Sequence, residues 1–172
     1  MNYNQASKIL QTVEYIPYPK TYNVKEDYRL VNRLYNDYGG NVGEMTAINL
    51  YVFQHIDLDN ESLKKIMIKV AEVEIKHLYL IGDLIKQLGK KPYYINSRGR
   101  QWSAEHINYR TSNIAEVMKY NINIENTAIN NYLQDKNYTD NKSIKDLLDR
   151  IILDEESHMK IFKGILNDYT IG

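Results

Sequence analysis

The feature that most constrains the fold of this chain is an internal repeat. Residues 44–51 read Glu-Met-Thr-Ala-Ile-Asn-Leu-Tyr and residues 125–132 read Glu-Asn-Thr-Ala-Ile-Asn-Asn-Tyr, so six of eight positions match at an offset of 81 residues. The same offset relates two Glu-x-x-His sequences, which start at Glu74 and Glu155. Two copies of one helical unit in a chain of single-domain length predict a bundle with pseudo-two-fold symmetry.

Apolar residues recur at helical spacing over residues 61–88 and 142–168, which predicts two long helices. Asn113, followed by Glu116, resembles a capping box and opens another helix that extends to about Gln134. Residues 90–110 contain Gly, Pro and the only Trp, and they read as a long crossover connection. We therefore predict an all-α fold, an antiparallel four-helix bundle whose helix pairs, about 41–88 and 113–168, are joined by that crossover.

The N-terminal residues follow a different pattern from the bundle. Residues 1–24 include Pro17, Pro19 and several tyrosines, which predicts an extended arm. A short helix is expected from about Lys25 to Tyr38, ended by the Gly39-Gly40 pair. The predicted domain is thus residues 25–172, and the aromatic residues of the arm favour a homo-oligomer.

Each half of the repeat supplies one Glu and, 30 residues later, a Glu-x-x-His. Positions i and i+3 share a helix face, so both side chains can point into the bundle although they interrupt apolar stripes. Four carboxylates and two imidazoles at a bundle axis are the ligands of a di-iron or di-manganese centre, and two divalent cations balance the four negative charges. The predicted ligands are Glu44, Glu74, His77, Glu125, Glu155 and His158.

Tyr51 and Tyr132 lie seven residues after Glu44 and Glu125, on the same helix faces. They are candidates for hydrogen bonds to ligand carboxylates, and the alternative is that they pack in the core.

Composition excludes several other classes of protein. The sequence has no cysteine, which excludes thiolate zinc sites, iron–sulfur clusters and a rubredoxin-type iron centre. The 22 basic and 22 acidic residues balance, so no strong field favours nucleic acid or an anionic membrane as a partner. The first residues do not resemble a signal peptide, and no apolar run is long enough to span a bilayer, so a cytoplasmic location is expected.

The run from Gly39 to Met45, Gly-Gly-Asn-Val-Gly-Glu-Met, and the Glu74-x-x-His77 sequence resemble manganese catalases and their shorter relatives. These proteins belong to the ferritin-like superfamily, together with rubrerythrins and bacterioferritins, and the resemblance covers about residues 30–168. It implies a ferritin-like fold and disproportionation of hydrogen peroxide at a dimanganese centre. The catalase resemblance implies that Glu155 is an outer-sphere acid/base, whereas the rubrerythrin resemblance implies a sixth ligand. The chain is shorter than full-length manganese catalases and lacks their extended C-terminal region.

We therefore expect an oxidoreductase that acts on hydrogen peroxide or O2, catalase-like or peroxidase-like, with two iron or manganese ions as cofactor. A peroxidase would require a separate electron donor, whereas disproportionation requires none. The alternative is a ferritin-like ferroxidase that binds and stores iron. A third possibility is an interaction protein in which the metal is structural.

Overall fold

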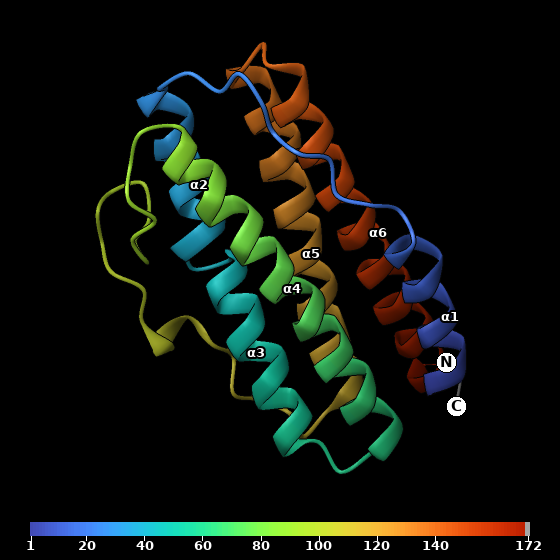
Figure 1. The fold of residues 1–172 in the computed structure, drawn as a ribbon. Coiled ribbons are helices and arrows are strands. Elements are labelled where there is room, and N and C mark those ends of the chain that lie inside the picture. The colour runs from blue at the N-terminus through green and yellow to red at the C-terminus, as the bar shows by residue number, and fades with distance from the viewer. Residues whose placement is uncertain (171–172) are drawn as a thin grey trace.

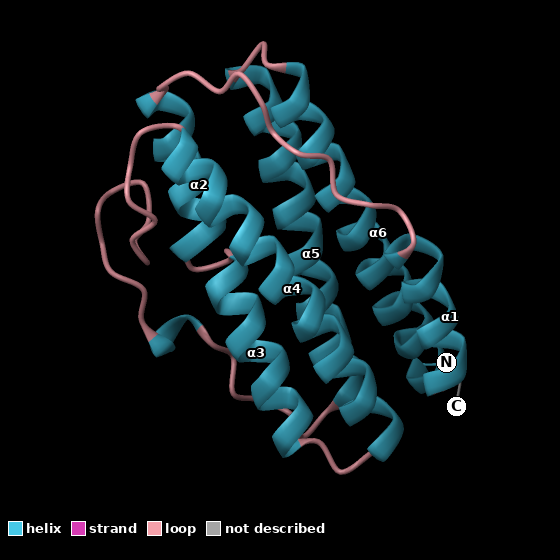
Figure 2. Cartoon of the chain, in the orientation of Figure 1, coloured by secondary structure: helices cyan, strands magenta, loops and turns pink. Residues whose placement is uncertain are grey.

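The computed structural model describes residues 1–170 and has six α-helices in this range (Figures 1 and 2). Two short 3-10 helices, Ala104–His106 and Lys136–Tyr138, lie in the connections. The α-helices are α1 (Tyr3–Glu14), α2 (Tyr28–Gly39), α3 (Glu44–Asp57), α4 (Glu61–Gln87), α5 (Ile114–Asp135) and α6 (Lys142–Thr170). Helices α3 and α4 pack as one antiparallel pair, and α5 and α6 as another (Figure 1). The predicted all-α bundle of two helix pairs is confirmed.

Side-chain caps fix where the bundle helices begin. Asn60 Oδ1 accepts hydrogen bonds from the backbone N–H groups of Ser62 and Leu63 at the start of α4. Asn113 Oδ1 accepts from the Glu116 N–H at 3.2 Å, as the capping pattern predicted for α5. These bonds satisfy donors that have no partner within the helix, so the sequence itself sets the register of each ligand-bearing helix.

Glycines bring α2 close to the start of α3. A Cβ atom at Gly43 would overlap the carbonyl oxygens of Asn36 and Asp37, so only glycine allows this approach. The predicted break at Gly39-Gly40 is therefore a tight corner that places Glu44 in the first turn of α3. The predicted crossover is also present, and Trp102 Nε1 ties it to the bundle by donating to Thr46 Oγ1 at 2.9 Å.

The N-terminal segment differs from the predicted extended arm over residues 1–24, because residues Tyr3–Glu14 form α1. The helix forms because Ala6 and Leu10 are spaced to bury one face, and it packs against α6 and α4 (Figure 1). Pro17 and Pro19 follow the helix and leave residues 15–27 without helical structure. The short helix predicted from Lys25 is present as α2.

The core consists of two apolar clusters. One includes Met67, Val70 and Phe162, and the other includes Ile81 and Leu148. The two clusters flank residues 74–77 of α4 and 155–158 of α6, so the predicted ligands form a polar layer between two apolar ones.

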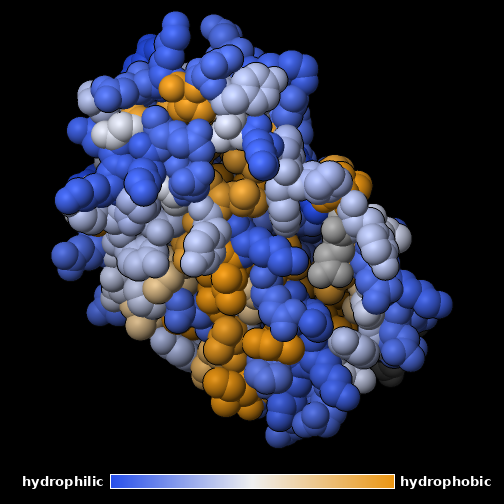
Figure 3. All heavy atoms as spheres, in the orientation of Figure 1, coloured by the Kyte–Doolittle hydropathy of each residue, from blue (hydrophilic) through white to orange (hydrophobic). Residues whose placement is uncertain are grey.

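The surface is largely polar, with a stripe of apolar side chains over α3 and α4 on the face shown in Figure 3. Ile56 of α3 and Ile75 of α4 are among the exposed apolar side chains. Apolar surface of this kind is typical of protein contacts, and the homo-oligomer remains a prediction. Within residues 1–170 we find no helix with the length and apolar character of a membrane span.

Candidate metal centre

The structure brings all six predicted ligands together in the middle of the bundle. Their side chains come from all four bundle helices, and each residue is at most 4% exposed. The six are Glu44 of α3, Glu74 and His77 of α4, Glu125 of α5, and Glu155 and His158 of α6. Such complete burial of four carboxyl groups requires compensating positive charge.

The carboxylates surround each histidine in the same way. His77 Nδ1 lies 2.8 Å from Glu74 Oε2, 3.1 Å from Glu155 Oε1 and 3.8 Å from Glu44 Oε2. In the other half, His158 Nδ1 lies 3.0 Å from Glu74 Oε1 and 3.1 Å from Glu155 Oε2. The 81-residue repeat of the sequence is thus a two-fold repeat of the site.

Glu74 and Glu155 each face both histidines through separate oxygens. Glu125 completes the His158 side, with Oε1 at 3.8 Å from Nδ1. Two groups of four residues therefore have ligand atoms within 4.8 Å of one another, and both include Glu74 and Glu155. In this arrangement Glu155 is the geometric equivalent of Glu74.

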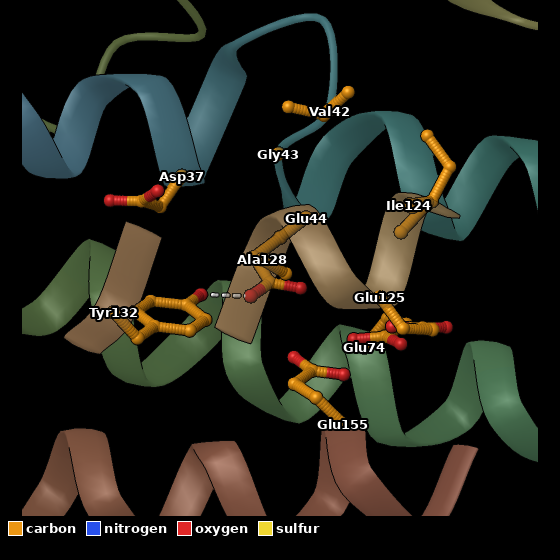
Figure 4. A pocket seen from close by; sticks show the side chains of 11 residues that line it. Asp37, Val42, Gly43, Glu44, Glu74, Ile124, Glu125, Ala128, Tyr132 and Glu155 are labelled. Atoms are coloured by element: carbon orange, nitrogen blue, oxygen red, sulfur yellow. Dashed lines mark hydrogen bonds between the residues drawn. The ribbon is translucent and has the colours of Figure 1, made fainter. Parts of the chain in front are cut away.

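The two tyrosines bond across the repeat. Tyr51 donates a hydrogen bond to Glu125, and Tyr132 donates one to Glu44, so each tyrosine supports the carboxylate of the other half (Figure 4). Both tyrosines are at most 1% exposed. Burial and the neighbouring carboxylate raise the pKa of each phenol well above its ordinary value, which keeps both phenols protonated as donors.

Without a metal ion, protons take over the charge balance. Burial, reinforced by Glu74, raises the pKa of the Glu44 carboxyl well above its usual range, and burial raises the pKa of Glu125 to about 8. Burial alone would lower the pKa of His77, but Glu155 and the other facing carboxylates outweigh it and raise the pKa well above its usual value. The metal-free site is therefore neutralised by protons on groups that metal ions would otherwise occupy.

The opposite shift is found in the two shared carboxylates. Burial opposes ionisation of Glu74 and Glu155, but the protonated His77 and His158 outweigh it and lower both pKa values. Glu74 Oε1 has no hydrogen-bond partner of good geometry within residues 1–170. A buried carboxylate oxygen that lacks a donor fits a metal ligand.

A small cavity of about 10 Å³, room for about one water molecule, adjoins the four carboxylates. Ala47 and Ala128, equivalent residues of the repeat, contribute to its wall, and neither histidine does. Small side chains on α3 and α5 therefore leave open space on the Glu44 and Glu125 side, where a water molecule or a small oxidant fits (Figure 4).

Sequence reasoning missed the polar group behind His77. Asp154 Oδ2 accepts hydrogen bonds from His77 Nε2 at 3.0 Å and from Tyr18 OH at 2.6 Å, and it forms an ion pair with Arg150 at 2.6 Å. A carboxylate at this place fixes the imidazole tautomer and leaves Nδ1 free for a metal. The signal was available, because Arg150 and Asp154 lie four residues apart among apolar positions of α6.

Comparison with known proteins supports the same kind of centre. The family model described as rubrerythrin matches residues 41–166. A probable manganese catalase of Clostridium acetobutylicum is 23% identical over 150 residues, which cover 75% of this chain and 66%, just under two thirds, of that relative.

Solved structures show the same fold. A manganese catalase from Anabaena PCC7120 superposes with a TM-score of 0.81 at 22% identity, over 90% of this chain and 78% of that one. A bacterioferritin from Desulfovibrio desulfuricans gives a TM-score of 0.64 at 19% identity, over 96% of this chain and 81% of that one. Together with the buried cluster, these relationships indicate a di-metal carboxylate protein whose cofactor is a pair of manganese or iron ions.

Proposed function

Because the chain belongs to the rubrerythrin family, we propose that it is a dinuclear manganese or iron oxidoreductase that acts on hydrogen peroxide or O2, with disproportionation of peroxide as the favoured reaction. The observation that carries the proposal is the symmetric cluster of six buried ligands beside a cavity large enough for one small molecule. The likeness to manganese catalases supports this choice among the reactions of such centres.

In this proposal the residues have separate roles. Glu44 and His77 hold one ion and Glu125 and His158 hold the other, while Glu74 and Glu155 contact both. Bound ions of this kind supply two-electron redox chemistry and polarise a bound oxygen atom. The equivalence of Glu74 and Glu155 around the histidines favours Glu155 as a ligand rather than an outer-sphere acid/base.

The surrounding residues position the ligands and exclude water. Tyr51 and Tyr132 hold Glu125 and Glu44 by hydrogen bonds, and their buried hydroxyls lie where a proton can be held beside the carboxylates. Apolar clusters above and below the polar layer exclude bulk water, which strengthens these interactions.

Disproportionation also fits the composition of the chain. The reaction 2 H2O2 → O2 + 2 H2O takes electrons from one peroxide and gives them to another, so it needs no outside donor. The sequence has no cysteine with which to build a thiolate electron-transfer centre of its own.

The decisive test is elemental analysis combined with an oxygen electrode on the same sample. We expect about two manganese ions per chain and release of O2 from hydrogen peroxide. Two iron ions, no O2 release and consumption of peroxide only with an added reductant would replace the catalase reaction by a peroxidase. Rapid oxidation of Fe2+ by a large hollow assembly would instead identify a ferroxidase that stores iron. Less than one metal ion per chain after reconstitution would refute the ligand assignment.

A further inference from the structure

A second buried acidic group lies at one end of the cavity, outside the ligand set. Asp37 of α2 is 4% exposed and Asp135 of α5 is 1% exposed. Arg33 donates a hydrogen bond to Asp135 Oδ1, and its side chain is 26% exposed. Within residues 1–170, Oδ2 of each of the two carboxyls has no hydrogen-bond partner.

The charges of this group are not balanced unless it holds a proton. Two carboxylates and the guanidinium of Arg33 leave one uncompensated negative charge in the interior, which is costly. The carboxyls of Asp37 and Asp135 lie within hydrogen-bonding reach of each other, and two ionised carboxylates cannot form that bond. One shared proton supplies both the missing charge and the missing donor. Burial, together with Asp135, raises the pKa of Asp37 well above its usual range.

The pair adjoins the metal centre. Asp37 lines the cavity together with Glu44, Tyr132 and Glu155, and Figure 4 shows Asp37 and Tyr132 at the same end of it. Asp135 lies three residues after Tyr132, on the same face of α5. The polar side chain of Asn131 also reaches Asp37 by a hydrogen bond. A chain of polar groups therefore runs from the partly exposed Arg33 through the two carboxyls to the cavity.

The equivalent position in the other half carries no such group. The offset of 81 residues relates Asp135 to Gln54, which is 2% exposed. Gln54 and Asn121 exchange two amide hydrogen bonds, at 2.9 and 2.8 Å. An amide pair is neutral and has no proton to give at ordinary pH. The two ends thus differ in the one property that proton transfer requires.

We propose that Asp37 and Asp135 form a proton-sharing carboxyl pair that carries protons between solvent and the cavity of the metal centre, with Asp37 facing the cavity. This role rests on the proposed function. Oxidation of one peroxide releases O2, two protons and two electrons, and reduction of the second takes up two protons and two electrons to give two waters. Both protons arise and are used in a cavity closed to bulk water, so a buried group that accepts and returns a proton serves both halves of the reaction.

The first test detects the shared proton itself and does not depend on activity. Infrared spectra of the metal-loaded protein are recorded in H2O and in D2O. We expect a carbonyl stretch of a buried, protonated carboxyl that shifts in D2O and disappears in both Asp37→Asn and Asp135→Asn. The control Asp59→Asn removes an exposed carboxyl and should leave the band unchanged. A band that survives in Asp37→Asn would overturn the proposal.

The second test measures peroxide turnover in variants that retain about two metal ions per chain and the wild-type melting temperature. We expect Asp37→Asn to lower kcat at least tenfold with little change in KM, to increase the solvent deuterium isotope effect and to be partly rescued by Asp37→Glu. Wild-type kcat and isotope effect in Asp37→Asn would refute the relay. If the wild-type protein shows no peroxide chemistry, the proposed function fails, whereas the infrared band still decides whether the pair holds a proton.

Discussion

Asp154 makes the two halves of the metal centre unequal, and this inequality is measurable. His77 Nε2 donates to Asp154 Oδ2 at 3.0 Å. The offset of 81 residues places Val73 at the equivalent position in the other half, and His158 Nε2 has no hydrogen-bond partner within residues 1–170. A carboxylate behind a ligating imidazole fixes its tautomer and raises its basicity, so the His77 position should bind metal more tightly.

The variant Asp154→Asn tests this reasoning. Asparagine keeps an acceptor oxygen for Tyr18 and for His77 but removes the charge, and Arg150 retains its hydrogen bond to the carbonyl of Ile16 at 2.8 Å. Loss of such a group typically weakens metal binding by about 10–100-fold, which is about 1.4–2.7 kcal/mol. We therefore expect one of the two binding steps to weaken by that factor and the other to change little.

Titration calorimetry of Mn2+ into the metal-free protein separates the two steps. The control Glu156→Gln removes an exposed carboxylate beside the same helix segment and should leave both affinities unchanged. Wild-type affinities in Asp154→Asn, or equal weakening of both steps at an unchanged melting temperature, would refute the argument.

Other predictions follow from the same geometry. Glu155→Gln should lower the metal content from about two ions per chain to less than one, as Glu74→Gln does, because both contact both positions, whereas an outer-sphere Glu155 would leave about two ions by elemental analysis. Tyr132→Phe should leave the fold intact but weaken Mn2+ binding about tenfold in calorimetry, because Glu44 loses its donor; unchanged affinity would contradict this. The pKa of Glu125 is about 8 in the metal-free protein, above its unfolded value, so its stabilising effect is complete below about pH 4.5 and is lost as the pH rises toward about 8. Calorimetric melting of the metal-free protein should therefore show a falling melting temperature over this range, and the metal-loaded protein should not.

The repeat made the bundle and its central cluster predictable, because charged ligand residues rarely recur by chance at one fixed offset on two apolar helix stripes. Helix caps such as Asn113 gave the element boundaries. The prediction failed for α1, since the prolines after it suggested an extended segment and the burial of Ala6 and Leu10 depends on contacts with α6 and α4 that no local pattern reveals. Asp154 was missed for a related reason, because its role depends on a histidine from another helix.

The departures from symmetry locate the specialised part of the centre. The ligands obey the repeat, and the residues behind them do not. Val73 is replaced by Asp154 behind His77, and Gln54 is replaced by Asp135 near Tyr132. Tyr132 bonds to Glu44, and Glu44 and His77 belong to the same group of ligands.

Both departures therefore converge on one metal position, which gains a more basic histidine on one side and a carboxyl pair on the other. A symmetric site of identical ligands would bind two equal ions. The polar groups outside the ligand set instead make the position formed by Glu44 and His77 the tighter one and the one nearer the proton source, so the proton steps of peroxide chemistry should take place there.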